Sequence, residues 1–349
     1  MNPVAIKEFA PALIAWQKTH GRHDLPWQNT RDPYKVWLSE IMLQQTQVVT
    51  VKDYFARFLV AHPTVASLAA ASLDDVLALW SGLGYYSRAR NMHRCAQDVV
   101  ALHGGAFPQT AEVLQTLPGI GPSTAAAIAS LCFSERVAIL DGNVKRVLTR
   151  LLGFDADLAK SANEKALWAL ATQVLPNDDL WTAMPHYTQG VMDLGATLCT
   201  TRSPNCLLCP AETLCAAKKL GRPESFPVKT KTLKRTSQSL WLLWATLPDG
   251  SVYLEQRPTP GVWAGLYCLP VFDSYEALTA AVSPADVSLL QDGEVFKHVL
   301  THKDLHIHPV RLIVKTQNNI KVAGQWFAAT AWFKLGLPAP IRKLLSLNV

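Results

Sequence analysis

The chain has 349 residues, of which 49% are hydrophobic and 17% charged, and its formal net charge is +6. This length favours two domains, because single cores rarely grow beyond about 250–300 residues, and the composition excludes a disordered or fibrous chain. No uncharged apolar run reaches the roughly 18 residues of a membrane-spanning helix, and the start lacks the pattern of a secretion signal. We therefore expect a cytoplasmic protein with no membrane partner.

The pattern of residues 1–217 predicts a region that is almost entirely helical. Apolar residues recur at helical spacing in segments such as 65–80 and 124–133. Turn signals separate such segments at 103–105 and 117–119. We expect this region to form a mostly α domain.

Within it, one predicted helix carries a carboxyl among apolar residues. Glu40 shares a helical face with apolar residues three or four positions away, at Val36, Trp37 and Leu43. Because burial of a carboxylate is costly, we expect the pKa of Glu40 to be raised. The alternative is an ordinary surface glutamate at the edge of an interface.

A Gly-rich turn joins two predicted helices in LPGIGPSTAAAIAS. Gly119 and Gly121 permit positive φ and let the backbone approach a partner closely. The second helix begins with free N–H groups and a positive dipole end, which together suit a phosphate. This pattern is the hallmark of the helix-hairpin-helix DNA-binding element, and the alternative is an ordinary helix corner.

The next apolar run ends at Asp141, which we predict to be the N-cap of a helix that begins near Gly142. Backbone N–H donors at such a cap stabilise the ionised carboxylate. An N-cap aspartate is usually structural. Together with Glu40, however, it would supply one neutral and one ionised carboxyl, which is what cleavage of a glycosidic bond requires.

Four of the seven cysteines lie within 17 residues in the pattern C-x6-C-x2-C-x5-C: Cys199, Cys206, Cys209 and Cys215. Four thiolates this close can enclose one metal centre. Disulfides are a first alternative, disfavoured in a chain without a secretion signal, and zinc is a second, which the C-x2-C pair would suit. The short, unequal spacings favour one [4Fe–4S] cluster.

The charge excess lies in residues 218–235, which hold seven basic side chains and one acidic one. We interpret this segment as a basic linker that is either simply solvated or contacts DNA phosphates. Beyond it, residues 239–247 and 251–257 predict a hairpin, followed by a helix and a further strand. Residues 236–349 should therefore form a smaller α+β domain.

These features together resemble the endonuclease III superfamily of helix-hairpin-helix DNA glycosylases. The segments WLSEIMLQQTQV, GLGYYSRARN, LPGIGPSTAAAIAS and ILDGNVKRVL are similar to the adenine DNA glycosylases of that superfamily. The carboxyl-terminal region more loosely resembles their Nudix-like domain, without the carboxylates of a Mg²⁺-dependent hydrolase. The resemblance implies a monomeric [4Fe–4S] enzyme of base excision repair that flips adenine, mispaired with 8-oxoguanine or guanine, out of double-stranded DNA.

By the same resemblance, Glu40 is the general acid that protonates adenine, Asp141 stabilises the oxocarbenium-like sugar, and Asn143 supports Asp141. Ser123 stands where endonuclease III has a lysine that forms a Schiff base, so the implied enzyme releases the base without cutting the strand. Lys145 could form an adventitious adduct with the abasic sugar.

A second set of residues is expected to contact DNA or the lesion: Leu43, Gln44, Gln45, Tyr85, Gly119, Gly121, Ser123, Lys145, Thr301 and His302. Leu43 and the two glutamines match the segment that enters the duplex, and Tyr85 matches the ring that wedges beside 8-oxoguanine. Leu300, Thr301 and His302 stand where many relatives have Phe-Ser-His, so the hydroxyl is kept at Thr301 and the aromatic ring is lost at Leu300. Arg88, which follows Tyr85 at helical spacing together with Arg90 and Arg94, is a candidate phosphate contact or simply part of an exposed, solvated face.

Two other functions stay open from the sequence. One is a related enzyme that removes thymine or uracil opposite guanine. The other is a catalytically silent DNA-binding module whose cluster senses redox state or charge transport. The match at Glu40 and the presence of a second domain favour the adenine enzyme.

Overall fold

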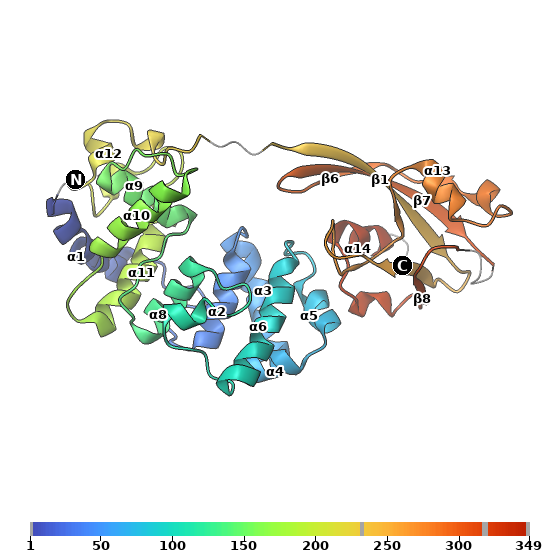
Figure 1. Ribbon diagram of the computed structural model, residues 1–349, viewed down its shortest axis with the longest axis horizontal. Coiled ribbons are helices and arrows are strands. Elements are labelled where there is room, and N and C mark those ends of the chain that lie inside the picture. Colours follow the sequence, from blue (N-terminus) through green and yellow to red (C-terminus); the bar gives the residue numbers. More distant parts are fainter. Residues whose placement is uncertain (1–2, 231–233, 316–319, 347–349) are drawn as a thin grey trace. The chain divides into compact units, whose positions relative to one another are not determined.

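The computed structural model describes residues 3–230, 234–315 and 320–346 (Figure 1). The chain forms two compact units: a helical unit of residues 1–69 and 94–232, and a sheet unit of residues 70–93 and 233–349. Among the described residues, no helix is both long and apolar enough to cross a membrane.

The helices of the amino-terminal region, in chain order, are α1 (Pro3–His20), α2 (Pro33–Leu43), α3 (Val48–Ala61), α4 (Val65–Ala70), α5 (Leu73–Trp80), α6 (Ser87–His103), α7 (Ala111–Leu114), α8 (Pro122–Phe133), α9 (Gly142–Leu152), α10 (Ser161–Gln173), α11 (Leu180–Thr197) and α12 (Ala216–Lys219). The single helix expected over residues 65–80 is in fact two. Ser72 interrupts it, because its side chain accepts a hydrogen bond from the Asp75 N–H and so caps a new helix.

The helix α11 packs against α1, α8 and α9 in the helical unit. Two of its glycines allow this close packing. A Cβ added to Gly190 would lie 3.1 Å from the Cβ of Gln17 on α1, and a Cβ added to Gly195 would lie 2.8 Å from the Cβ of Asn143 on α9. Real Cβ atoms are not found at the shorter distance. The lack of a side chain at Gly190 therefore allows the close approach of α1 to α11, and the lack of one at Gly195 allows that of α9.

The segment predicted as a linker is partly ordered against the helical unit. Residues 216–219 form α12, and Lys218 pairs with Glu212. Thr230 donates from its backbone N and its Oγ1 to the carboxylate of Asp157, over 3.2 and 2.5 Å. Residues 231–233, including Lys231, lie outside the described residues.

The sheet unit is built on eight strands: β1 (Thr236–Thr246), β2 (Val252–Gln256), β3 (Tyr267–Cys268), β4 (Val271–Phe272), β5 (Gln291–Asp292), β6 (Phe296–Val299), β7 (Lys303–Ile313) and β8 (Gln325–Phe327). β1 and β7 run parallel, from the pair Thr236 and Lys303 to the pair Thr246 and Ile313. The expected hairpin is confirmed, because β1 and β2 are antiparallel.

Helices cover both faces of this sheet. Leu278 of α13 (Tyr275–Ala280) packs with Leu243 of β1 on one face. Ile341 and Leu345 of α14 (Ala339–Ser346) pack with Leu242 on the other (Figure 1). The alternation of buried side chains along β1 therefore supplies two separate cores, as expected for a strand covered on both sides.

Candidate active site and cysteine loop

Glu40 lies in the last turn of α2, whose start is fixed by Pro33 and by the Asp32 carboxylate, which accepts from the Tyr34 N–H at 3.0 Å. The side chains around Glu40 on this helix are buried, and Glu40 itself is partly buried. Desolvation by the surrounding protein, assisted by the negative charge of Asp141, raises the pKa of Glu40 to about 7. The predicted raised pKa is therefore confirmed.

Asp141 is the N-cap of α9, as predicted, and its Oδ1 accepts from the Val144 N–H at 2.7 Å. The hydroxyl of Ser123, at the start of α8, accepts from the N–H of Leu140 at 3.1 Å. This bond ties the residue before Asp141 to the hairpin helix. Because the charge of Asp141 contributes to the pKa of Glu40, the structure brings the two predicted carboxyls within electrostatic reach of each other.

Asn143 is held by the next turn of α9. Arg146 donates through Nη2 to the Asn143 Oδ1 at 2.8 Å and to the Gly195 carbonyl at 2.6 Å. The Nε of the same guanidinium donates to the carbonyl of Cys199 at 2.7 Å. Arg146 thus joins the first turn of α9 to α11 and to the cysteine loop.

The two glycines of the hairpin turn have different backbone conformations. Gly119 has φ of 76°, which glycine permits, whereas Gly121 has φ of −82° and is the N-cap of α8. An extended N-cap precedes a helix without needing left-handed backbone. Gly121 has no side chain with which to cap the helix. Lys145, which was expected to contact DNA, forms an ion pair with Glu164 at 2.6 Å.

The segment after Glu40 ends α2 beside the hairpin helix. Leu43 is partly buried, and the amide of the C-cap residue Gln44 donates to the Thr124 hydroxyl at 3.4 Å. Gln45 has φ of 56° and is exposed. This left-handed residue places a polar side chain on the surface directly after the C-cap of α2.

A cavity that the sequence did not indicate opens one turn of α2 from Glu40. It measures about 270 Å³, close to the lower end of the ~300–1,000 Å³ range of small-ligand sites, and Val36 lines it. Its wall includes Arg22, Gln28 and Gln189. Both polar atoms of the Gln28 amide are buried there without a hydrogen-bond partner. The cavity therefore offers polar groups of both kinds, donors and acceptors.

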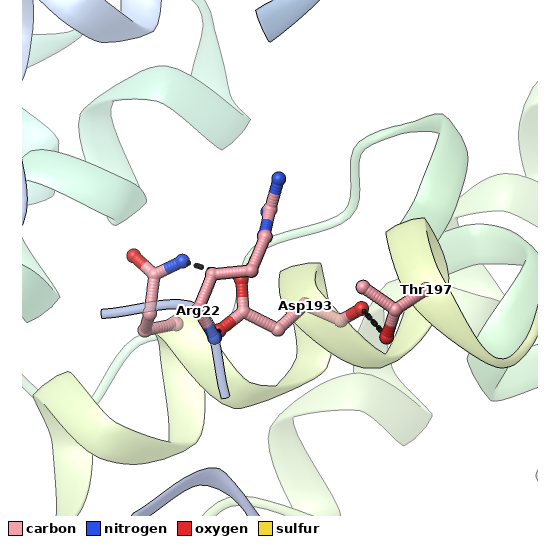
Figure 2. Close-up of polar contacts among 4 residues, drawn as sticks. Arg22, Asp193 and Thr197 are labelled. Atoms are coloured by element: carbon pink, nitrogen blue, oxygen red, sulfur yellow. Dashed lines mark hydrogen bonds and ion pairs between the residues drawn. The ribbon is translucent and has the colours of Figure 1, made fainter. Parts of the chain in front are cut away.

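Asp193 on α11 holds two residues of the cavity wall, Arg22 and Gln189, and Figure 2 shows it between Arg22 and Thr197. Its side chain is fully buried, and its Oδ1 accepts from the Arg22 Nε at 2.7 Å and from the Gln189 amide at 2.8 Å. Its Oδ2 accepts from the Arg22 backbone N–H at 3.0 Å, and its carbonyl accepts from the Thr197 hydroxyl at 2.8 Å. A buried carboxylate is tolerated only when paired in this way.

The four clustered cysteines line one small cavity, together with Arg150. Burial raises the pKa of Cys209 to about 12, and the neighbouring sulfurs of Cys199, Cys215 and Cys206 add to this effect. None of the seven cysteines, all of which lie in the described residues, forms a disulfide bond. In the part of the chain that the structure describes, no three His, Cys, Asp or Glu side chains are grouped so as to hold a metal ion.

Arg150 is a buried cation directed at this cavity. Its Nη1 donates to the Cys199 Sγ at 3.3 Å and to the Thr200 carbonyl at 2.7 Å. Its Nη2 and Nε donate to the carbonyls of Thr201 and Phe226, at 3.1 and 3.3 Å. The arginine therefore orders the loop and places positive charge beside a cysteine sulfur.

In the sheet unit, Tyr85 and Thr301 meet. Tyr85 is 43% exposed, has φ of 48° and shares a hydrogen bond between its hydroxyl and that of Thr301. Thr301 and His302 are exposed at the turn between β6 and β7. Arg88, a candidate phosphate contact, is buried instead and donates to the carbonyls of Leu83 and Gly84, so that expectation was wrong.

Comparison with known proteins agrees with this arrangement. Residues 38–173 match the model of the HhH-GPD superfamily base excision DNA repair proteins, and residues 241–347 match a NUDIX domain. A thermostable thymine-DNA glycosylase of known structure is 28% identical, with a TM-score of 0.54 over 62% of this chain and 97% of that chain. A trapped endonuclease III–DNA intermediate shares the fold, at 24% identity and a TM-score of 0.50.

A helix-hairpin-helix fold with a carboxyl on α2 and another at the start of α9 thus defines a base-excision DNA glycosylase. An adenine DNA glycosylase of Buchnera aphidicola (subsp. Acyrthosiphon pisum) is 34% identical over 97% of this chain and 96% of its own. The human adenine DNA glycosylase is 43% identical over 61% of this chain and 40% of its own. The chain belongs to the adenine DNA glycosylase family.

Proposed function

We propose that this enzyme removes adenine paired with 8-oxoguanine or guanine in double-stranded DNA, by acid-assisted hydrolysis of the N-glycosidic bond. The observation that carries the proposal is the carboxyl of Glu40, whose pKa near 7 leaves a large protonated fraction at neutral pH beside the capped carboxylate of Asp141. An acid near its operating pH combines the right protonation state with proton-transfer driving force.

In this reaction Glu40 donates its proton to a ring nitrogen of adenine, which makes the base a better leaving group. The C–N bond then breaks, and positive charge develops on the sugar, where the carboxylate of Asp141 stabilises it. Glu40, now ionised, accepts a proton from the attacking water. Asn143, held by Arg146, supports the first turn of α9, from which Asp141 projects.

The cavity beside α2 is the proposed pocket for the flipped adenine. An amide can donate to a ring nitrogen and accept from the exocyclic amino group at once, and the Gln28 amide is buried there without a partner. Arg22 and Gln189 are held at the same wall by Asp193. Base flipping would bring adenine from the duplex to this pocket, with Gln45 and Leu43 entering the vacated stack.

The cysteine cavity is the proposed site of one [4Fe–4S] cluster, which would order the loop that follows α11. Four soft donors line it, and thiols whose pKa is raised by burial, as that of Cys209 is, need a cation to be held as thiolates. We expect the purified protein to be brown and to contain about four iron atoms per chain. Iron analysis and visible absorbance test this, and a colourless protein with one bound zinc would contradict it.

The sheet unit is the proposed reader of 8-oxoguanine, through Tyr85, Thr301 and His302. The hydrogen bond between the hydroxyls of Tyr85 and Thr301 supports this role. The two residues lie far apart in the sequence, and each is expected to contact the lesion. We propose that the enzyme works as a monomer in the cytoplasm, where its DNA substrate is exposed. The basic residues between positions 218 and 235 would contact phosphates.

The test is base release and strand scission on duplexes that carry A:8-oxoguanine, A:G, T:G or U:G. We expect adenine release from the first two and no strand scission, because Ser123 cannot form a Schiff base. Release of thymine or uracil would support the alternative specificity. Tight binding to all four without release of any base would show a silent DNA-binding module.

A further inference from the structure

The turn that carries Tyr85 is bonded to the segment that leads into α14. The carbonyl of Leu337 accepts hydrogen bonds from the Ser81 hydroxyl at 3.2 Å and from the Tyr86 hydroxyl at 2.9 Å. Both donors and the acceptor belong to the sheet unit. One carbonyl therefore holds the residue that ends α5 and the residue directly after Tyr85.

Arg342 on α14 completes this network. Its Nε donates to the Ser81 hydroxyl at 2.9 Å, and the same hydroxyl donates to Leu337. Its Nη1 and Nη2 donate to the carbonyls of Phe333 and Leu335, at 3.1 and 2.7 Å. The planar guanidinium thus fixes the chain before α14 and the end of α5 at the same time.

Packing beneath the network is tight. A Cβ added to Gly336 would lie 2.5 Å from the Cβ of Leu77 on α5, a distance at which something must shift. Leu337 and Leu77 are fully or almost fully buried. A second tie lies farther along α6, where Arg90 donates through Nη1 to the Ala264 carbonyl at 2.7 Å. The turn between α5 and α6 therefore has little freedom to move against α14.

The backbone of the turn needs such support. Gly82 and Gly84 have φ of 103° and 71°, and Tyr85 follows with φ of 48°. A non-glycine residue with such a φ is strained and persists only where its surroundings enforce it. Trp80 and Arg88 enforce it from one side, since both donate to the Gly84 carbonyl, at 2.9 and 3.2 Å.

We propose that Arg342 is a positioning residue for lesion discrimination, which acts through Ser81 and Leu337 to hold Tyr85 against Thr301. The inference rests on the lesion-reading role proposed above for Tyr85 and Thr301. Arg342 takes no part in the carboxyl chemistry of Glu40 and Asp141. Its loss should therefore change the choice of the opposite base and leave the release of adenine itself intact.

The experiment compares single-turnover adenine release from A:8-oxoguanine and A:G duplexes in the full chain. We expect Arg342→Met to lower the ratio of the two rates about tenfold, as loss of one well-placed hydrogen-bonding group does, while the A:G rate stays within about twofold. Lys343→Met is the matched control. It removes the neighbouring cation of α14, which is exposed, and should leave the ratio unchanged.

Two further variants separate positioning from general destabilisation. Ser81→Ala removes the shared hydroxyl without a charge change and should lower the ratio in the same direction. When Arg342→Met is added to a Tyr85→Ala variant, the ratio of the two rates should fall by less than a further twofold. The residue through which Arg342 acts is already absent from that variant. Thermal denaturation of each variant checks that the fold is kept.

An unchanged ratio in both Arg342→Met and Ser81→Ala would overturn the inference. An equal loss in the presence and absence of Tyr85 would also overturn it, since Arg342 would then act elsewhere. If the wild-type enzyme releases adenine equally well opposite 8-oxoguanine and guanine, the lesion-reading role on which the inference rests is contradicted. A wild-type enzyme that removes no adenine would instead contradict the proposed function.

Discussion

Glu40→Gln is expected to lower adenine release about 1,000-fold while duplex binding persists, because glutamine keeps the shape and hydrogen bonding of Glu40 but cannot donate the proton. The same proton sets the pH dependence of the wild-type enzyme. Since the pKa of Glu40 is about 7 and the protonated form is active, the single-turnover rate should fall about tenfold per pH unit above pH 7.

The same variant should be more stable than the wild type at alkaline pH. The pKa of Glu40 rises from 4.5 to about 7 on folding, so the folded state binds its proton more tightly and loses stability as the pH rises from about 4.5 to 7. The loss is at most about 3 kcal/mol, and glutamine does not suffer it. Urea denaturation at pH 4 and pH 8 should therefore show equal stability at the lower pH and a more stable Glu40→Gln variant at the higher.

Glu8→Gln is the matched control for both measurements, because Glu8 is exposed on α1 and the substitution is the same. Neither rate nor stability should change in it. Adenine release by Glu40→Gln within tenfold of the wild type would reject the role of general acid. Equal stability at both values of pH would reject the raised pKa instead.

Arg22→Met is expected to lower the free energy of unfolding by about 3–5 kcal/mol, because it leaves the fully buried carboxylate of Asp193 without its cation. Adenine release should fall about 100-fold as well, since a wall of the proposed base pocket loses its anchor.

The double variant Arg22→Met/Asp193→Leu separates pairing from packing. If the pair is a buried ion pair, removing both charges should recover part of the stability that Arg22→Met loses, although the pocket stays inactive. Lys52→Met is the control, because Lys52 pairs with the exposed Asp24 and such pairs contribute about 0–1 kcal/mol. A double variant no more stable than Arg22→Met would contradict the assignment.

The positions of both carboxyls could be predicted because each has a local signal. Glu40 lies on an apolar face of its predicted helix. Asp141 is preceded by an apolar run and followed by apolar residues at helical spacing. The same kind of signal marks Asp193, a carboxylate in the apolar segment GVMDLGA, and could have identified it. Its partner Arg22 has no such signal, because the two residues are 171 positions apart and nothing local shows that α1 ends beside α11.

The errors have equally specific causes. Helical spacing suggested an exposed face for Arg88, but the preceding glycine turn folds back and offers its carbonyls to that side chain. Ser72 followed three residues later by Asp75 is a recognisable capping pattern, and it would have divided the helix predicted over residues 65–80.

The close packing at Gly195 makes the proposed reaction centre sensitive to a single methyl group. Alanine at this position would put its Cβ 2.8 Å from the Cβ of Asn143 and 3.3 Å from its carbonyl oxygen, so the first turn of α9 would have to withdraw from α11. Asp141 begins that turn and would move with it. The spacing of the proposed catalytic groups thus depends on the lack of a side chain at Gly195 in the neighbouring helix α11, and a change that is conservative in size and polarity can disable chemistry in which this residue takes no part.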